Sequence, residues 1–167
     1  DDEIFQASNN ILDTLDGLTD EEHQDFYALI PDNPFLITAN EDKTLSKEDK
    51  LNSLLNYGLE RMKIGDISGA VLYFEAAISV EPDSKVAWLE LGKAQSKNEN
   101  DRKAISALKR VLSMNNDHLD AWMLLAICYT NETLSNEACQ ALKEWISRHS
   151  KYSEYFNKHS DYMEHSD

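Results

Sequence analysis

The side chains with the clearest chemical potential gather at the ends of two predicted helices, and their chemistry is binding. They are Gln95, Asn98 and Glu99 on the first helix, and Thr130, Asn131 and Glu132 on the second. An asparagine amide offers both a donor and an acceptor, which suits recognition of the backbone of an extended peptide. Asparagine also ends many helices, so spacing alone leaves a purely structural role for Asn98 and Asn131 equally open.

Residues suited to catalysis or metal binding do not form a recognisable pattern. His149, His159 and His165 crowd the C-terminal tail, but their spacing fits no zinc site and no cysteine is close to them in sequence. The five glycines form neither a phosphate-binding loop nor a nucleophile elbow. We therefore expect a protein that is not an enzyme and that uses no cofactor or metal.

The elements that carry the polar residues repeat along the chain. Three stretches share one pattern at a constant spacing of about 34 residues, a period typical of stacked helix–turn–helix repeats. Within each stretch a small residue is followed by another small residue after 12 positions and by a large apolar one after 16. Helices approach closely only where neither presents a large side chain. The three sets are Gly58, Ala70 and Phe74; Gly92, Ala104 and Leu108; Ala126, Ala138 and Leu142.

This order of residues resembles the tetratricopeptide repeat and predicts an all-α superhelix of three helical hairpins. The expected helices are 51–64 with 67–80, 85–98 with 101–114, and 119–132 with 135–148. Short polar residues at the turns within the hairpins, Asp66, Asn100 and Thr133, are expected to cap the second helices. The predicted domains are an acidic leader or linker with short helices (1–50), the repeats (51–150, as 51–84, 85–118 and 119–150), and a polar and aromatic tail or inter-repeat linker (151–167).

Charge is concentrated in the leader. The chain carries 31 acidic and 16 basic residues, a net charge of −15, and 14 of the acidic residues fall within residues 1–50. Nucleic-acid binding needs a basic face, so this composition argues against it. No apolar run is long enough to span a bilayer and the first residues are no signal peptide, while the absence of an initial Met suggests a fragment. Cys128 and Cys139 are expected to be buried, small apolar side chains in a reducing compartment.

The leader also contains a short predicted helix. Thr19 and Glu22 form a capping box ahead of Phe26, Leu29 and Ile30, and the prolines at positions 31 and 34 end the helix. Such a segment either packs on the repeats or binds a partner from a disordered arm, and we favour packing.

The sequence from Ala70 to Ile146 closely resembles the receptor for type-1 peroxisomal targeting signals. The resemblance rests on the runs FEAA (74–77), AWLELGKAQSKNE (87–99) and TNE (130–132), with NPF (33–35) and GLERMKIGD (58–66) before them. A sister family of neuronal channel-associated proteins shares these motifs.

The resemblance implies a cytosolic cargo receptor that cycles to the peroxisomal membrane. Its partners would be cargo proteins that end in Ser-Lys-Leu-type signals, and membrane docking proteins that bind regions mostly absent from this chain. Asn131 and Thr130 match positions that contact the signal, and Ile127 matches an apolar position of the same pocket. Asn98 and Glu99 match the second repeat, where an acidic residue suits a basic residue of the signal. The groups that grip the terminal carboxylate belong to a second set of repeats that this chain lacks.

Two further functions remain open. A channel-regulatory or scaffold protein would bind the C-terminus of a partner with the same fold, whereas an assembly adaptor would use another surface and tolerate changes at Asn131. The repeats that clamp acidic chaperone C-termini are disfavoured, because the matching places carry Leu55, Leu59, Glu90 and Leu124. The apolar face at the open end of the stack also predicts self-association.

Overall fold

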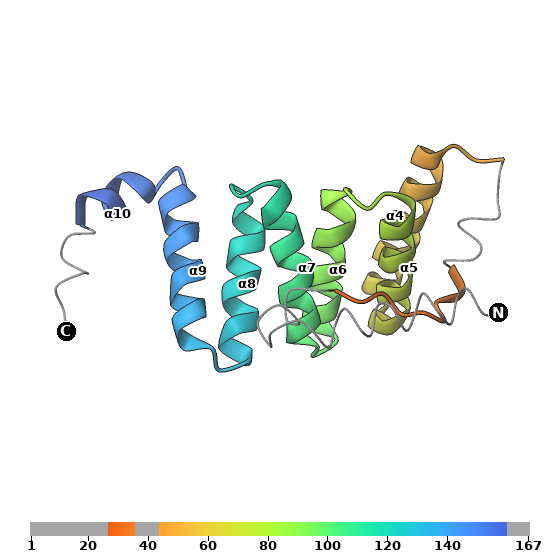
Figure 1. Ribbon diagram of the computed structural model, residues 1–167, viewed down its shortest axis with the longest axis horizontal. Helices are drawn as coiled ribbons and strands as arrows, with labels where there is room; N and C mark the ends of the chain where they lie inside the picture. The colour runs from red at the N-terminus through yellow and green to blue at the C-terminus, as the bar shows by residue number, and fades with distance from the viewer. Residues whose placement is uncertain (1–26, 36–43, 160–167) are drawn as a thin grey trace, which may run out of the picture.

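A computed structural model describes residues 27–35 and 44–159, and within these ranges every regular element is a helix. Helices α4 to α9 form three antiparallel hairpins that stand side by side, with α10 beyond the last (Figure 1). This confirms the predicted all-α fold of repeated hairpins. The helices are α4 (Lys47–Ile64), α5 (Ile67–Val80), α6 (Lys85–Lys97), α7 (Asp101–Met114), α8 (Leu119–Asn131), α9 (Ser135–Arg148) and α10 (Ser153–His159).

Each of the first two hairpins closes where a glycine of one helix meets a large side chain of the other. A Cβ atom on Gly58 would lie 2.4 Å from Cε1 of Phe74, and one on Gly92 would lie 2.9 Å from Cδ2 of Leu108. Both large residues are fully buried. In the third hairpin the equivalent large residue, Leu142, is 39% exposed because only α10 follows α9 in the described chain.

Tryptophans tie each later hairpin to the turn before it. The indole Nε1 of Trp88 donates to the backbone oxygen of Pro82 at 2.8 Å, and Nε1 of Trp122 donates to that of Asn116 at 2.7 Å. The two pairs are one repeat period apart, so the same bond recurs in successive repeats. Each ring packs against the apolar core and its polar edge satisfies a turn carbonyl.

The turns inside the three hairpins share a left-handed backbone conformation, but they do not share a side chain that caps the second helix. Gly65, Glu99 and Thr133, which occupy the same position of successive repeats, have φ angles of 83°, 57° and 62°. The predicted caps are correct only at Asp66, whose Oδ1 accepts from the Gly69 amide at 3.0 Å. Asn100 makes no capping bond, and Thr133 lies before the N-cap in the left-handed region. Turn geometry, which the residue types alone do not reveal, decides which side chain faces the free amides.

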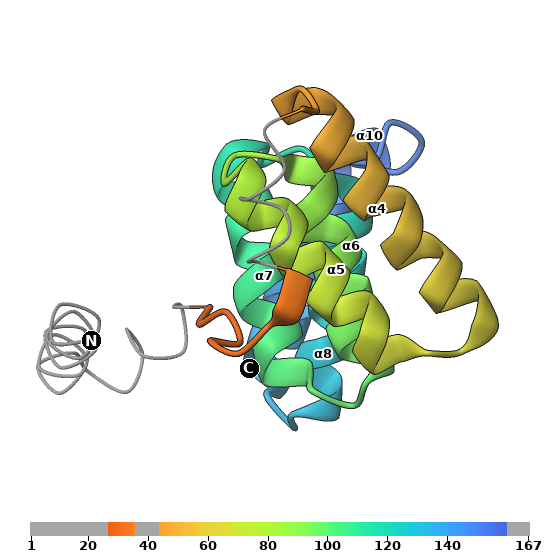
Figure 2. The same cartoon turned by 90° about the vertical axis from the view of Figure 1, so that its right-hand side faces the viewer.

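The helices form two layers, with the first helices of the hairpins on one side and the second helices on the other. Figure 2 shows residues 27–35 lying against the layer of α5 and α7, on the side away from α4. Residues 27–30 are irregular, so the predicted helix through Leu29 and Ile30 is wrong. Instead of closing a helical turn, the amide of Ile30 donates to Oε2 of Glu75 at 3.0 Å.

The packing of this segment on the repeats is confirmed for residues 27–35, which we call the leader segment. Tyr27 and Asn33 are buried, and the ring of Phe35 stacks on Tyr73 with centroids 4.0 Å apart. The predicted capping box at Thr19 and Glu22 lies outside the described residues. None of the described helices combines the length and the apolar character that crossing a membrane requires.

Candidate functional site

The first helices of the three hairpins together line one hollow of about 500 Å³, which we call the groove. Its residues occupy the same few positions of each repeat, so α4, α6 and α8 present the same helical face to it. A hollow lined by three successive helices suits an extended chain. The lining residues are Leu59, Met62 and Lys63 of α4; Glu90, Lys93, Ser96 and Lys97 of α6; and Leu124 of α8.

Three of the predicted site residues share this groove face on α8. Ile127, Thr130 and Asn131 occupy the positions in the third repeat that the groove residues Lys93, Ser96 and Lys97 occupy in the second. All three are exposed, and Ile127 keeps 46% of its surface open. The fold therefore brings an apolar side chain, a hydroxyl and an amide together in line with the groove.

The polar groups of this trio are partly engaged within the protein. Oγ1 of Thr130 donates to the backbone oxygen of Ala126 at 2.8 Å, the usual bond of a threonine inside a helix. Nδ2 of Asn131 donates to Oδ2 of Asp101 at 3.1 Å, which fixes the orientation of the amide. The amide oxygen of Asn131 has no such bond within the described ranges, so it is available to accept from a backbone N–H.

Asn98 and Glu99 lie elsewhere, at the edge where α6 turns into α7. Asn98 is the C-cap of α6, and its Oδ1 accepts from Oγ of Ser68 at 3.4 Å. Glu99 is exposed and has a positive φ, so its position is set by the turn. The structure thus does not bring Asn98 and Glu99 onto the groove face with the residues of α8.

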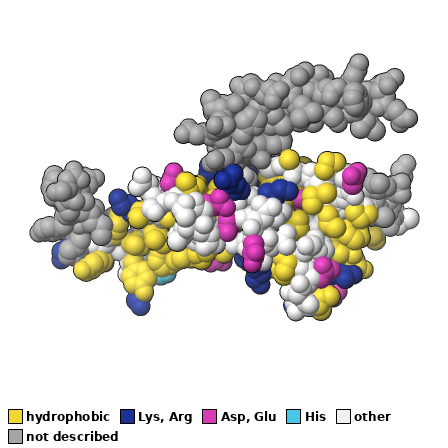
Figure 3. Space-filling view, turned by 90° about the horizontal axis from the view of Figure 1, so that it is seen from below, with side chains coloured by type: hydrophobic (Ala, Val, Ile, Leu, Met, Phe, Trp, Pro, Cys, Tyr) yellow, Lys and Arg dark blue, Asp and Glu magenta, His cyan; other side chains and the backbone are white. Residues whose placement is uncertain are grey.

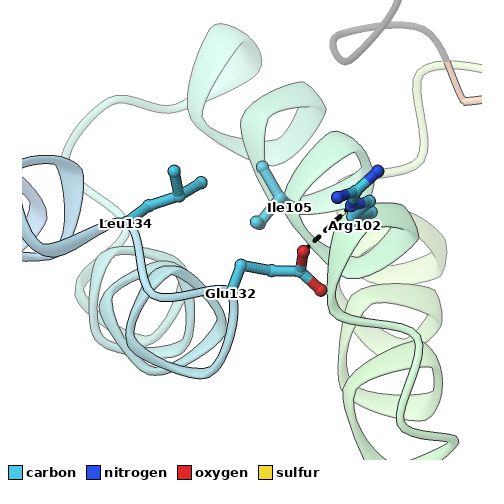
Figure 4. Close-up of a pocket in the computed structure, with 4 residues that line it drawn as sticks. All are labelled: Arg102, Ile105, Glu132 and Leu134. Atoms are coloured by element: carbon cyan, nitrogen blue, oxygen red, sulfur yellow. Dashed lines mark hydrogen bonds and ion pairs between the residues drawn. The ribbon is translucent and has the colours of Figure 1, made fainter.

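The equivalent edge of the next repeat explains what these positions do. Nε of Arg102 and Oε2 of Glu132 form an ion pair at 2.9 Å, and they follow Ser68 and Asn98 by one repeat period (Figure 4). With Ile105 and Leu134 they surround a cavity of about 80 Å³. A contact between neighbouring hairpins recurs at this position, which gives Asn98 and Glu132 a structural role.

Gln95, which the sequence placed among the polar candidates, is buried. Only 2% of its surface is exposed, and its Nε2 donates to the hydroxyl of Tyr27 at 2.6 Å. The reason is that the leader segment covers this side of α6. Gln95 is therefore unavailable to a ligand in the groove.

A polar network that the sequence patterns did not predict holds the leader segment on the repeats. The hydroxyl of Tyr27 donates to Oε1 of Glu75 at 2.8 Å, while Oε2 of Glu75 accepts from the amide of Ile30. Nδ2 of Asn33 donates to the backbone oxygen of Leu72 at 2.7 Å. Burial, together with the charge of Glu75, raises the pKa of the Tyr27 hydroxyl far above its usual value, so it stays a proton donor.

A signal for this network exists in the sequence. Glu75 stands in an otherwise apolar run of α5, whereas the equivalent positions of the next repeats carry Lys109 and Lys143. Gln95 likewise stands where the third repeat carries Tyr129. In the second repeat the aromatic ring comes from the leader instead, since Tyr27 packs edge-on against Trp88 with centroids 5.7 Å apart.

The two thiols have different environments. Cys128 is fully buried, and burial raises the pKa of its thiol to about 12, which keeps it protonated and unreactive near neutral pH. Cys139 is exposed on α9, so the expectation that both cysteines are buried is wrong there. The third hairpin has its second helix at the open end of the stack, which leaves that side chain uncovered.

Hydrophobic side chains are also exposed on the surface at the two ends of the stack. In Figure 3 hydrophobic side chains gather towards both ends of the stack, over α9 and α10 on the left and over α4 and α5 on the right. Exposed apolar residues include Leu142, Tyr152 and Tyr155 at one end and Tyr57 and Ile64 at the other.

Comparison with known proteins agrees with this architecture. The sequence model of the tetratricopeptide repeat matches residues 51–84 and 86–118. Two solved structures share the fold. A chain of the CopN-Scc3 complex has a TM-score of 0.62 and 17% sequence identity, and the match covers 87% of either chain. The crystal structure of MamA has a TM-score of 0.56 and 20% sequence identity, and the match covers 74% of this chain and 77% of MamA.

Curated relatives are much closer in sequence. The PEX5-related protein of Mus musculus is 45% identical over 95 residues, which are 57% of this chain and 17% of the relative. The peroxisomal targeting signal receptor of Candida albicans is 41% identical over 102 residues, 60% of this chain and 17% of the relative. The chain thus spans about one-sixth of the length of these relatives. Residues 51–84 and 86–118 match the tetratricopeptide repeat, and the repeat segment is similar to that of the peroxisomal targeting signal receptors and the PEX5-related proteins.

Proposed function

We propose that this chain is part of a cytosolic peroxisomal import receptor that binds cargo through a C-terminal Ser-Lys-Leu-type signal in the groove. The observation that carries the proposal is the exposed trio of Ile127, Thr130 and Asn131, aligned with the groove residues of α6. Ile127 would contact the apolar side chain of the signal, and the amide of Asn131 would bind its backbone. The receptor would cycle to the peroxisomal membrane and meet docking proteins there through regions outside this chain.

The same geometry supports a weak rather than a tight site. The groove residues include no arginine, and the fork of an arginine is the group best suited to a terminal carboxylate. Each missing charge-assisted bond withholds about 1.5–3 kcal/mol, and about 1.4 kcal/mol changes the affinity tenfold. We therefore expect this chain alone to bind the signal weakly or not at all.

Fluorescence anisotropy of a labelled peptide ending in Ser-Lys-Leu tests the proposal. The peptide is titrated with this chain and with a version extended through the downstream repeats, and its amidated form serves as the ligand control. Asn131→Ala removes the proposed contact, while Asn136→Ala makes the same change at an exposed position of α9. Tight binding by the extended chain that is lost with the amide and with Asn131→Ala, but kept with Asn136→Ala, supports the proposal. Submicromolar binding by this chain alone would contradict the expectation that it lacks the groups that bind the terminal carboxylate.

A second candidate is a channel-regulatory or scaffold protein that binds a partner's C-terminus in the same groove. The observation in its favour is the 45% identity with the PEX5-related protein, against 41% with the receptor of Candida albicans. Absence of Ser-Lys-Leu binding by both chain lengths, with the fold intact by circular dichroism, favours this candidate.

A further inference from the structure

The groove contains cations that the proposed function does not use. Lys63 and Lys97 lie in the last turns of α4 and α6, at the same position of successive repeats, and both line the hollow. Both are exposed, and neither has an ion-pair partner in the described part of the chain. A third groove lysine, Lys93, is paired with Glu90 at 2.8 Å, which makes that pair nearly neutral.

The arginines of the chain differ from these two lysines, whereas exposed lysines such as Lys85 and Lys143 likewise have no ion pair in the described part of the chain. All four arginines are in ion pairs, namely Arg61 with Asp66, Arg102 with Glu132, Arg110 with Asp83, and Arg148 with Glu144 and Asp117. A chain with a net charge of −15 has ample acidic residues to neutralise two more lysines. Among the lysines that line the groove, Lys93 is paired with Glu90, so Lys63 and Lys97 supply its unpaired positive charges.

The helix dipole accounts for only part of this placement. A lysine in the last turn of a helix is favoured by the partial negative charge of the helix end. The third first-helix, α8, has Asn131 at this position, so a cation is not required there by the fold. The side chains also face the groove rather than the outer surface, where the dipole would serve as well.

We propose that the groove binds an extended peptide with acidic side chains, which Lys63 and Lys97 recognise as carboxylate partners. In an extended peptide alternate side chains point the same way. One set would carry the carboxylates towards the lysines, and the other would rest on the apolar wall of Leu59, Met62 and Leu124. An acidic segment of a partner protein would then be a second ligand of the groove, separate from the Ser-Lys-Leu-type signal.

This inference uses the same groove as the proposed function but needs no free C-terminus. A test with a peptide blocked at both ends therefore succeeds or fails independently of Ser-Lys-Leu recognition. The probe is a fluorescein-labelled peptide of about ten residues, acetylated and amidated, with glutamate alternating with leucine or alanine. Two matched peptides replace every glutamate with glutamine or with lysine.

The full chain is titrated with each peptide by fluorescence anisotropy. We expect the glutamate peptide to bind at least about tenfold more tightly than the glutamine peptide, and more weakly as salt rises from about 50 to about 300 mM. The lysine peptide should bind more weakly still.

Charge reversal then locates the site. The double variant Lys63→Glu/Lys97→Glu should lose at least about fivefold in affinity for the glutamate peptide and gain affinity for the lysine peptide. Lys143→Glu, the same change at an exposed position of α9, should alter affinity by less than about twofold. Equal binding of the glutamate and glutamine peptides overturns the proposal, as does an equal loss in the Lys143→Glu variant. Because these lysines are exposed, circular dichroism should show all variants folded.

Discussion

The two faces of the repeat stack treat their polar groups in opposite ways. On the face of the second helices, the leader segment covers Glu75 of α5, and its Tyr27 also reaches Gln95 of α6 to form one buried network. On the face of the first helices, Lys63 and Lys97 stand exposed around an open hollow. The repeats supply the same backbone to both faces, so the difference comes from a few side chains.

The contrast shows how a repeat protein can use the residues of one face for stability and leave those of the other face free for recognition. A buried carboxylate such as Glu75 is costly unless it is fully hydrogen-bonded, so the leader segment and the repeats need one another. Exposed lysines cost little and contribute little to folding, which leaves them available to a ligand. The face covered by the leader segment contributes to the stability of the fold, and the open face is the one that we propose binds a ligand.

Removing the aromatic ring from the closed face should have the largest effect. Tyr27→Ala deletes a buried ring and leaves Glu75 and Gln95 without their shared partner, so we expect the free energy of unfolding to fall by about 3 kcal/mol. Urea denaturation measures this loss. Tyr155→Ala, at a site that is 70% exposed, should cost less than about 0.5 kcal/mol. A loss below about 1 kcal/mol for Tyr27→Ala would show that the leader segment is not part of the stable fold.

Ionisation of the same hydroxyl should weaken the closed face at high pH. The pKa of Tyr27 is raised in the folded state, so the unfolded chain releases this proton first, above about pH 10. The stabilisation is fully present below that pH and declines above it, by about 1.4 kcal/mol per pH unit. Urea unfolding at about pH 8, 10 and 11 measures the decline in the free energy of unfolding.

The control for this pH effect is Tyr27→Phe, which keeps the ring and removes the proton. Other tyrosines ionise in both proteins, so only the difference between their pH profiles reports on Tyr27. Parallel profiles for the two proteins would contradict a buried, protonated hydroxyl at this site.

A glycine substitution in a turn at the edge between the two faces should change the free energy of unfolding by a smaller amount, and it should increase stability. Thr133 is β-branched and has a φ of 62°, a conformation that glycine adopts freely. Thr133→Gly should therefore raise the melting temperature and add about 1 kcal/mol of stability. Gly65→Ala, at the equivalent turn with φ of 83°, should lose a similar amount. A loss in the Thr133→Gly variant would mean that the threonine side chain stabilises the turn.

Changes on the open face should have the smallest effect on folding. Lys63→Ala and Lys97→Ala should each change the free energy of unfolding by less than about 0.5 kcal/mol, because both side chains are exposed and have no ion pair within the described ranges. Thermal and urea unfolding beside the unchanged protein test this. A loss comparable to that of Tyr27→Ala would erase the distinction between the two faces.

Local spacing predicted the hairpins well because their contacts are set by the repeat itself. The small residues at 58 and 92 lie at the predicted close approach of the helices, although the atoms nearest to them belong to the large residues at 74 and 108 rather than to the small ones at 70 and 104. Helix bounds within the repeats follow from the same periodicity, and they agree with the prediction to within one residue except at the start of α4. The family resemblance was also carried by linear runs of residues, which comparison with curated relatives supports.

The leader and the groove could not be predicted in the same way. The prolines at 31 and 34 were predicted to end a helix, but residues 27–30 form none, and their course depends on Glu75, 45 residues from Ile30. Likewise Lys63 and Lys97 belong to different repeats, and only the stacking of α4 on its neighbours brings both into one hollow. Gln95 looked exposed in sequence because nothing local shows that Tyr27 covers it.

The sequence by itself determined the helices, their pairing and the kinship of the repeats, since all three depend on residues within one or two turns or one repeat period of one another. Only the tertiary structure decided which polar residues are closed off and which remain open. Glu75 and Gln95 are buried because a segment distant in sequence packs over them. Asn131 and the two lysines remain accessible because no described segment covers the groove face of the first helices. Whether a side chain is buried depends on the segment that packs over it, and the residues next to it in the sequence do not identify that segment.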